Sequence, residues 1–246
     1  MSSEPGAQPV SPRIVSLVPC ITHTLLSVGG SRHIVGRTRY CPDCAAEVVG
    51  GILDIDDEAI ARLDPTLVLA DPEENGTTAL FRLADRFPVL SVDCTGVYDS
   101  LENLVKLARL VGRKDEGTAL ADAFAPWRQP RSAAATAAVL VWKDPYRCVG
   151  SQTYAGSLLR HFGVRLTCTG PGYPGTTLEA LAKQKPDLLL LPSEPCEFSP
   201  ADAEALSAAL GSGTRVLIVD GRALFWYGAF MVQSAADLTK ALGIPA

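Results

Sequence analysis

The sequence lacks several features that would point to common classes of protein. It contains no cluster of lysine and arginine and carries a net charge of −5, so nucleic acid and anionic membranes are poor candidates as partners. Its longest leucine run, Leu188 to Leu191, is far too short to cross a bilayer, so we expect no membrane span. The glycine-rich stretch GSGTR (211–215) precedes a predicted strand instead of following one, which argues against a nucleotide-binding loop.

A secretion signal and an evident disulfide framework are also missing. Residues 1–12 (MSSEPGAQPVSP) are polar and proline-rich, which predicts a disordered tail without the apolar segment of a signal. Seven cysteines are an odd number, so at least one lies outside any intramolecular disulfide, and a chain of 246 residues with 47% hydrophobic residues needs none for its core.

Apolar runs of strand length alternate with segments of helical periodicity along nearly the whole chain. Buried strands are expected at 13–19, 33–40, 67–70, 89–94, 138–142, 164–169, 187–192 and 215–221. Helices are expected at 20–30, 56–64, 77–87, 100–113, 114–127, 152–163, 177–185, 200–210 and 234–243.

One segment of this pattern occurs twice. Residues 58–74 (EAIARLDPTLVLADPEE) and 179–195 (EALAKQKPDLLLLPSEP) both begin with Glu-Ala, reach proline in the eighth place and continue through an apolar run into an acidic turn. The repeat predicts an α/β fold with two parallel-sheet lobes joined by a single α-helix near 114–128, and a ligand cleft between the lobes. The expected segments are a tail at 1–12, an N-terminal lobe at 13–99, connecting helices at 100–130 and a C-terminal lobe at 131–246.

Candidate ligand-binding residues follow from this topology, because parallel α/β sheets bind ligands at the carboxyl ends of their strands. Flat aromatic rings in these loops suit a large planar ligand, and an arginine can pair with its carboxylates or phosphates. Trp142, which ends a buried strand, is expected in the core instead. The candidates are Cys20, His23, Arg39, Tyr40, Cys41, Tyr146, Glu194, Cys196, Trp226 and Tyr227.

The cysteines of these loops leave two alternatives open. The first is direct binding of zinc, cobalt or copper by Cys20, Cys41, Cys44 and Cys196, with Cys148 and His23 nearby, although free cysteines are also ordinary buried residues. The second is a cytosolic enzyme with Cys20 as nucleophile and His23 as base, for which the sequence offers no orienting acid.

Four segments resemble a known family: RIVSLVPCITHTLLSVG (13–29), IVGRTRYC (34–41), PSEP (192–195) and DGRALFWYGA (220–229). They are similar to the ABC-importer substrate-binding proteins with a helical backbone, which include cobalamin- and iron-siderophore-binding proteins. The similarity covers residues 13–243. It implies a monomeric binding protein without catalysis or an obligatory cofactor, which carries a corrinoid, a ferric siderophore or another metal chelate to an ABC permease. A periplasmic or cell-surface location is implied, and a cytoplasmic one if the chain as given is the native full length.

The resemblance also implies that Glu58 and Glu179 dock against basic residues of the permease, although acids favour the first turn of any helix. The sequence departs from the family pattern at Cys20 and His23, where small or acidic residues are usual, and at Phe230, where arginine is common. We therefore expect its ligand to differ from those of the better-known members.

Overall fold

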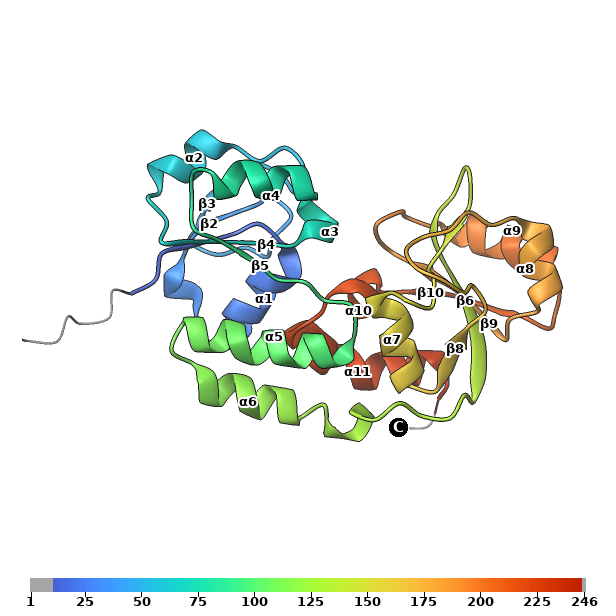
Figure 1. Ribbon diagram of the computed structural model, residues 1–246. Coiled ribbons are helices and arrows are strands. Elements are labelled where there is room, and N and C mark those ends of the chain that lie inside the picture. The colour runs from blue at the N-terminus through green and yellow to red at the C-terminus, as the bar shows by residue number, and fades with distance from the viewer. Residues whose placement is uncertain (1–10, 245–246) are drawn as a thin grey trace, which may run out of the picture. The chain divides into compact units, whose positions relative to one another are not determined.

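The computed structural model describes residues 11–244, which form two compact units, each built on its own sheet (Figure 1). Unit 1 comprises the described residues up to Asp93 together with Lys106–Gly117, and unit 2 comprises Cys94–Val105 together with the chain from Thr118 onward. The chain therefore passes between the units at Asp93, within the helix α5 (Val97–Leu110) and within the helix α6 (Lys114–Asp122).

Unit 1 contains a parallel five-stranded sheet in the order β3-β2-β1-β4-β5. The central strand β1 is fully buried, as its uninterrupted apolar run predicts. Its elements are β1 (Ile14–Ser16), α1 (Pro19–Ser27), a 3-10 turn (Ser31–His33), β2 (Ile34–Arg37), β3 (Glu47–Val48), α2 (Asp57–Arg62), β4 (Leu67–Ala70), α3 (Pro72–Asn75), α4 (Thr77–Ala84) and β5 (Val89–Ser91).

The core of unit 1 lies between this sheet and the helices α2 and α4. Ile60 of α2 and Leu83 of α4 are completely buried against Val15, Leu17 and Val68 of the strand region. The helix α1 lies on the opposite side of the sheet (Figure 1). Helices on both faces explain why the strands are apolar on both sides.

Unit 2 contains a second sheet in the order β10-β9-β6-β7, with β8 also paired to β6. The pairs β6–β8, β6–β9 and β9–β10 are parallel, whereas the short β7 is antiparallel to β6. Its elements after α6 are a 3-10 turn (Ala125–Trp127), β6 (Ala135–Trp142), β7 (Arg147–Cys148), α7 (Tyr154–His161), β8 (Val164–Leu166), α8 (Leu178–Gln184), β9 (Leu188–Pro192), α9 (Pro200–Leu210), β10 (Arg215–Val219), α10 (Gly221–Phe225) and α11 (Ala229–Leu242).

The sheet of unit 2 is also covered on both faces. Leu181 of α8 and Leu206 of α9 pack with Leu140, Leu189 and Leu191 of the strands. The helices α7, α10 and α11 lie on the other side of the sheet (Figure 1). The buried leucine run therefore belongs to a central strand, which accounts for its continuous hydrophobicity.

The predicted α/β fold with parallel sheets is confirmed, and the repeated sequence segment forms the same pair of elements in each unit. Residues 58–74 contain α2 and β4, and β4 pairs with β1; residues 179–195 contain α8 and β9, and β9 pairs with β6. In both cases proline lies between the helix and the strand, where it cannot continue the helix.

Several elements differ from the sequence-based prediction. The helix expected over 114–127 ends at Asp122, because Pro126 cannot donate a backbone hydrogen bond and disfavours the helical conformation of the residue before it. The helix expected from 234 begins at Ala229. The short elements β3, α3, β7 and α10 were not predicted, because segments of two to five residues carry little periodic signal.

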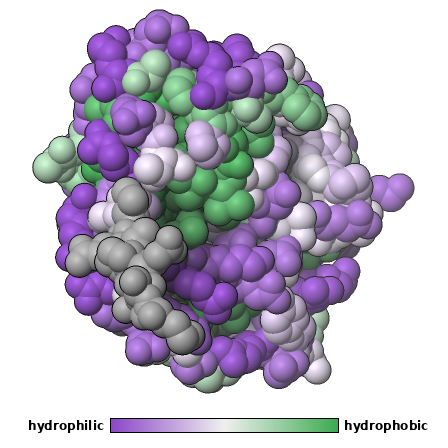
Figure 2. Space-filling model, turned by 60° about the vertical axis from the view of Figure 1, so that its left-hand side comes forward, coloured by the Kyte–Doolittle hydropathy of each residue, from purple (hydrophilic) through white to green (hydrophobic). Residues whose placement is uncertain are grey.

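The surface is mostly hydrophilic, but hydrophobic residues gather in one area of the face seen in Figure 2. Exposed apolar side chains of unit 1 include Leu53 and Phe81, at 79% and 71% exposure. Among residues 11–244, every helix is too short or too polar to span a lipid bilayer.

Candidate functional site

The predicted site residues lie in the segments that follow the carboxyl ends of the parallel strands in both units. Cys20 and His23 lie in the helix α1, Trp226 and Tyr227 follow the helix α10, and the other candidates lie in loops or at strand ends. In unit 1 these segments follow β1 and β2, and in unit 2 they follow β6, β9 and β10.

Two of the three predicted cysteines of unit 1 are buried. Cys20 is 4% and Cys41 is 5% exposed, whereas Cys44 and His23 are partly exposed. The Sγ of Cys41 lies 3.1 Å from Thr38 Oγ1 and 3.7 Å from the carbonyl oxygen of Ser16. Burial raises the pKa of the Cys41 thiol, so this thiol stays protonated at neutral pH and is a weak metal ligand and nucleophile.

Arg39 and Tyr40 behave differently from each other. The Arg39 guanidinium donates two hydrogen bonds to Asp54, at 2.9 and 2.6 Å, and these bonds lower the pKa of Asp54. Arg39 therefore already has a carboxylate partner within unit 1. The Tyr40 ring lies under the Arg39 guanidinium at 5.6 Å and is 59% exposed, so its outer surface is accessible to a ligand.

Sequence reasoning missed Arg37, which organises the loop after β2. Its side chain is 10% exposed, donates to Asp43 at 2.6 Å and donates to the backbone carbonyl groups of Thr38 and Cys41 at 3.3 Å. A charged residue at the end of a buried strand was the available signal. Arg37 holds the turn that places Arg39 and Tyr40.

In unit 2 the structure brings together Glu194 and Trp226, two candidates 32 positions apart. The indole Nε1–H of Trp226 donates to Glu194 Oε1 at 2.8 Å, and both side chains are partly buried. Burial raises the pKa of Glu194 above its ordinary value, although the hydrogen bond from Trp226 opposes this shift.

The remaining candidates of unit 2 range from buried to partly exposed. Tyr227 is only 4% exposed and packs edge-on against the Tyr154 ring at 6.1 Å. Tyr146 and Cys196 pack at the margin of the core between β6, β9, α8 and α9.

Two expectations about unit 2 are wrong. Trp142 is 47% exposed and lies outside the core, as the last residue of β6 after a run of five buried residues. Cys148 is bonded to Cys168 in a disulfide and is no free thiol. This disulfide joins β7 to the segment after β8. Both strands pair with β6 along the edge opposite β9, so the pairing of the two cysteines follows from the sheet arrangement and not from the sequence.

The candidate metal ligands form no preassembled metal centre within either unit. Among residues 11–244, no three side chains of His, Cys, Asp or Glu are grouped so that they could hold an ion. The cysteines outside the disulfide are Cys20, Cys41, Cys44, Cys94 and Cys196.

The two candidate docking glutamates lie in equivalent first turns but have different surroundings. Glu58 is exposed at the start of α2, and its Oε1 pairs with Arg86 Nη1 at 2.8 Å. Glu179 is exposed at the start of α8, where hydrogen bonds from its own backbone and from Thr177 lower the pKa of its carboxyl group. Glu179 is therefore ionised at neutral pH, and both glutamates lie in accessible positions.

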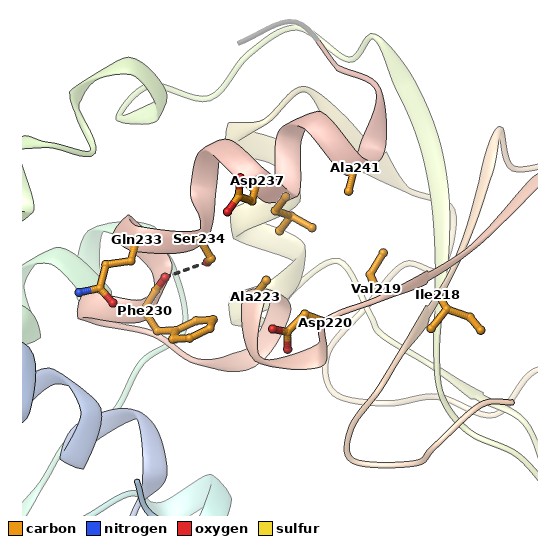
Figure 3. A pocket seen from close by; sticks show the side chains of 10 residues that line it. Ile218, Val219, Asp220, Ala223, Phe230, Gln233, Ser234, Asp237 and Ala241 are labelled. Carbon is orange, nitrogen blue, oxygen red and sulfur yellow. Dashed lines mark hydrogen bonds between the residues drawn. The ribbon is translucent and has the colours of Figure 1, made fainter. Parts of the chain in front are cut away.

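A groove of about 360 Å³ lies beside the edge strand β10 in unit 2. Its walls come from β10, α10 and α11, and Figure 3 shows Asp220, Phe230 and Asp237 around it. Asp220 is neutralised by Arg222 at 2.8 Å, so the groove is largely apolar with one further carboxylate, that of Asp237.

Comparisons with known proteins place this geometry in a family. Residues 14–166 match the family model described as periplasmic binding protein. A search of curated proteins found no match.

Solved structures similar to this chain are binding proteins of the same kind. The periplasmic heme-binding protein BhuT in complex with two hemes is 22% identical, with a TM-score of 0.76 over 94% of this chain and 97% of that one. The periplasmic heme-binding protein HutB of Vibrio cholerae is 18% identical, with a TM-score of 0.78 over 94% and 99%. The vitamin B12-binding protein BtuF of Vibrio cholerae is 17% identical, with a TM-score of 0.75 over 94% and 96%.

At these identities the structural likeness establishes the fold, whereas the family model covers more than half of the chain. The resemblance inferred from the sequence is thereby confirmed. This chain belongs to the periplasmic binding protein family, and it shares the fold of the solved heme- and vitamin B12-binding proteins.

Proposed function

We propose that this protein binds a large, flat metal chelate, of the heme, corrinoid or ferric-siderophore type, through the strand-end loops and delivers it to an ABC permease. The observation that carries the proposal is the contrast between aromatic and sulfur-containing side chains at these loops. Tyr40 and Trp142 are 59% and 47% exposed and Trp226 is partly exposed, whereas Cys20 and Cys41 are buried. Cys44 and Cys196 are only partly exposed. The most exposed groups are therefore the rings of Tyr40 and Trp142, and such rings can stack on a planar organic ligand.

The same contrast disfavours the two alternatives left open by the sequence. A thiolate metal site requires ionised sulfur, and the raised pKa of Cys41 opposes that state. Cys20 is only 4% exposed, so its thiol is poorly accessible to a substrate that it would attack as a nucleophile. We therefore propose a binding protein that returns its ligand chemically unchanged.

Titration with hemin, cyanocobalamin and a ferric tris-catecholate tests the proposal. We expect saturable binding of one of these probes with visible absorption bands of the intact chelate, and quenching of tryptophan emission. Trp226→Ala should weaken binding by about tenfold or more, because a stacked aromatic ring contributes one to a few kcal/mol.

Phe81→Ala is the matched control, since Phe81 is an exposed aromatic residue on α4, outside the strand-end loops. Its affinity should equal that of the natural chain. Absence of saturable binding to all three probes, or turnover of a probe into a new product, would reject the proposed function.

We further propose that Glu58 and Glu179 contact the permease and that the protein acts as a monomer. Glu→Ala at either position should reduce transport into proteoliposomes containing the cognate permease without changing chelate affinity, most strongly at low salt. Glu204→Ala, an exposed glutamate of α9, is the control. Unchanged transport in both variants would leave these acids with a helix-stabilising role alone.

A periplasmic or cell-surface location is also proposed. The Cys148–Cys168 disulfide supports it, because such bonds persist in oxidising compartments.

A further inference from the structure

The loops after β9 and β10 in unit 2 are joined at several points near Trp226. The backbone N–H of Ser193 donates to the carbonyl of Val219 at 3.0 Å, and the N–H of Gly221 donates to Ser193 Oγ at 3.0 Å. The Nε1–H of Trp226 then donates to Glu194 Oε1 at 2.8 Å. The turn after β9 and the helix α10 therefore behave as one piece.

Gly221 permits this close approach. A Cβ at position 221 would lie 2.6 Å from Glu194 Cγ and 2.8 Å from the backbone nitrogen and oxygen of Glu194. No larger residue fits without displacing the backbone that carries Glu194. Glycine at position 221 therefore allows the close approach of the two loops that brings Glu194 within reach of Trp226.

The Trp226 ring also has neighbours on its other sides. Phe230 meets it edge-on with ring centroids 5.4 Å apart, and the Arg222 guanidinium lies 5.9 Å from the Trp226 centroid and 5.2 Å from that of Phe230. Asp220 holds Arg222 at 2.8 Å. Packing thus limits where the ring can lie, and the hydrogen bond to Glu194 selects its orientation about the side-chain torsions.

We propose that Glu194 is a positioning residue that acts through Trp226, holding the indole in the orientation in which its accessible surface receives the chelate. This inference rests on the proposed function and assigns Glu194 a role other than direct ligand contact. An indole N–H can only donate, and a carboxylate is a strong, charge-assisted acceptor for it. A ring fixed before the ligand arrives avoids the entropic cost of ordering it on binding.

The first test uses the free protein and the indole N–H signals in a ¹H–¹⁵N correlation spectrum. The chain has three tryptophans, so Trp226→Phe identifies the signal of Trp226 by its loss. Glu194→Ala should move or broaden that signal, and Glu194→Gln should preserve most of it because an amide oxygen also accepts. The signals of Trp127 and Trp142 report whether the variants remain folded.

The second test is a double-mutant cycle with hemin and cyanocobalamin as probes. Glu194→Ala should weaken the binding of the accepted probe by about tenfold, the effect of losing one hydrogen bond to a charged group, and Glu194→Gln should restore most of the affinity. In the Trp226→Phe background, Glu194→Ala should have no further effect. Glu197→Ala, an exposed neighbouring acid, should leave the affinity unchanged.

The pH dependence of the affinity is a further test, because a purely structural role of Glu194 would not produce it. Burial raises the pKa of Glu194, and the nearby Asp220 raises it further, while the hydrogen bond from Trp226 and the Arg222 charge oppose the shift. The affinity should be constant above this raised pKa and fall, as the pH is lowered through it, to about the level of Glu194→Gln, because protonation replaces a charged acceptor by a neutral one. Glu194→Gln should show no such fall.

The outcomes separate the two claims. The positioning role would be overturned if the Trp226 signal did not move or broaden in Glu194→Ala. It would also be overturned if Glu194→Ala lowered the affinity equally in the natural chain and in the Trp226→Phe variant. If none of hemin, cyanocobalamin and the ferric tris-catecholate binds the natural chain, the proposed ligand class fails, and the indole signal alone decides whether Glu194 orients Trp226.

Discussion

Removing the Cys148–Cys168 disulfide should destabilise unit 2 by about 3 kcal/mol. The two cysteines are 20 positions apart, and closing a loop of about that length lowers the entropy of the unfolded chain by an amount worth about 3 kcal/mol at 25 °C. The loop contains all of α7 and β8, so the unfolded state of a substantial part of unit 2 is restricted.

Urea unfolding followed by tryptophan fluorescence is a suitable assay, because Trp127, Trp142 and Trp226 all belong to unit 2. With a urea dependence of about 2 kcal/mol per molar, the loss corresponds to a midpoint lower by about 1.5 M. The emission therefore reports the unit that carries the disulfide and is insensitive to unit 1.

Comparison of oxidised and reduced natural chain isolates the covalent bond. The Cys148→Ala/Cys168→Ala variant under reducing conditions then measures the additional loss of buried sulfur, about 1 kcal/mol, since these residues are 0% and 8% exposed. Cys44→Ala, at a partly exposed free thiol, is the control. Coincident midpoints for oxidised and reduced protein would refute the reasoning.

Three further predictions concern individual side chains. Gly221→Ala should lower the free energy of unfolding of unit 2 by about 2 kcal/mol, because its Cβ would overlap the backbone of Glu194; an unchanged urea midpoint would contradict the tight packing. Cys44 should react with iodoacetamide before Cys41, whose reaction should require a higher pH because burial raises its pKa; mass spectrometry of the labelled peptides would show the order. Trp142→Ser should change stability by less than about 0.5 kcal/mol, as at an exposed site, and a loss of several kcal/mol would show that the ring is buried in solution.

Much of the fold could be predicted from the sequence because its signals are local. The continuous apolar run of β9 and the proline before it specify a buried strand after a helix, whatever the rest of the chain does. The repeat of this pattern at 58–74 and 179–195 predicted two sheets of related plan, and the structure has them. The family likewise followed from segments whose order and spacing are visible in one dimension.

The site was predicted only as a set of loops, because the conformation and burial of each side chain depend on distant residues. Cys20 and Tyr40 both follow strands, yet Cys20 is buried in the first turn of α1 and Tyr40 is exposed. Trp142 ends the buried run of β6 and is nevertheless exposed, which the apolar pattern before residue 142 does not reveal.

The pairings that matter most for function were decided by tertiary structure alone. Cys148 meets Cys168 because β7 and the end of β8 lie along the same edge of β6, the edge opposite β9, and seven cysteines allow many other pairs. Glu194 meets Trp226 because β9 and β10 are neighbours in register and Gly221 lets their loops touch. Sequence periodicity determines which residues a strand buries, but only the packing of strands against one another determines which of their ends come into contact.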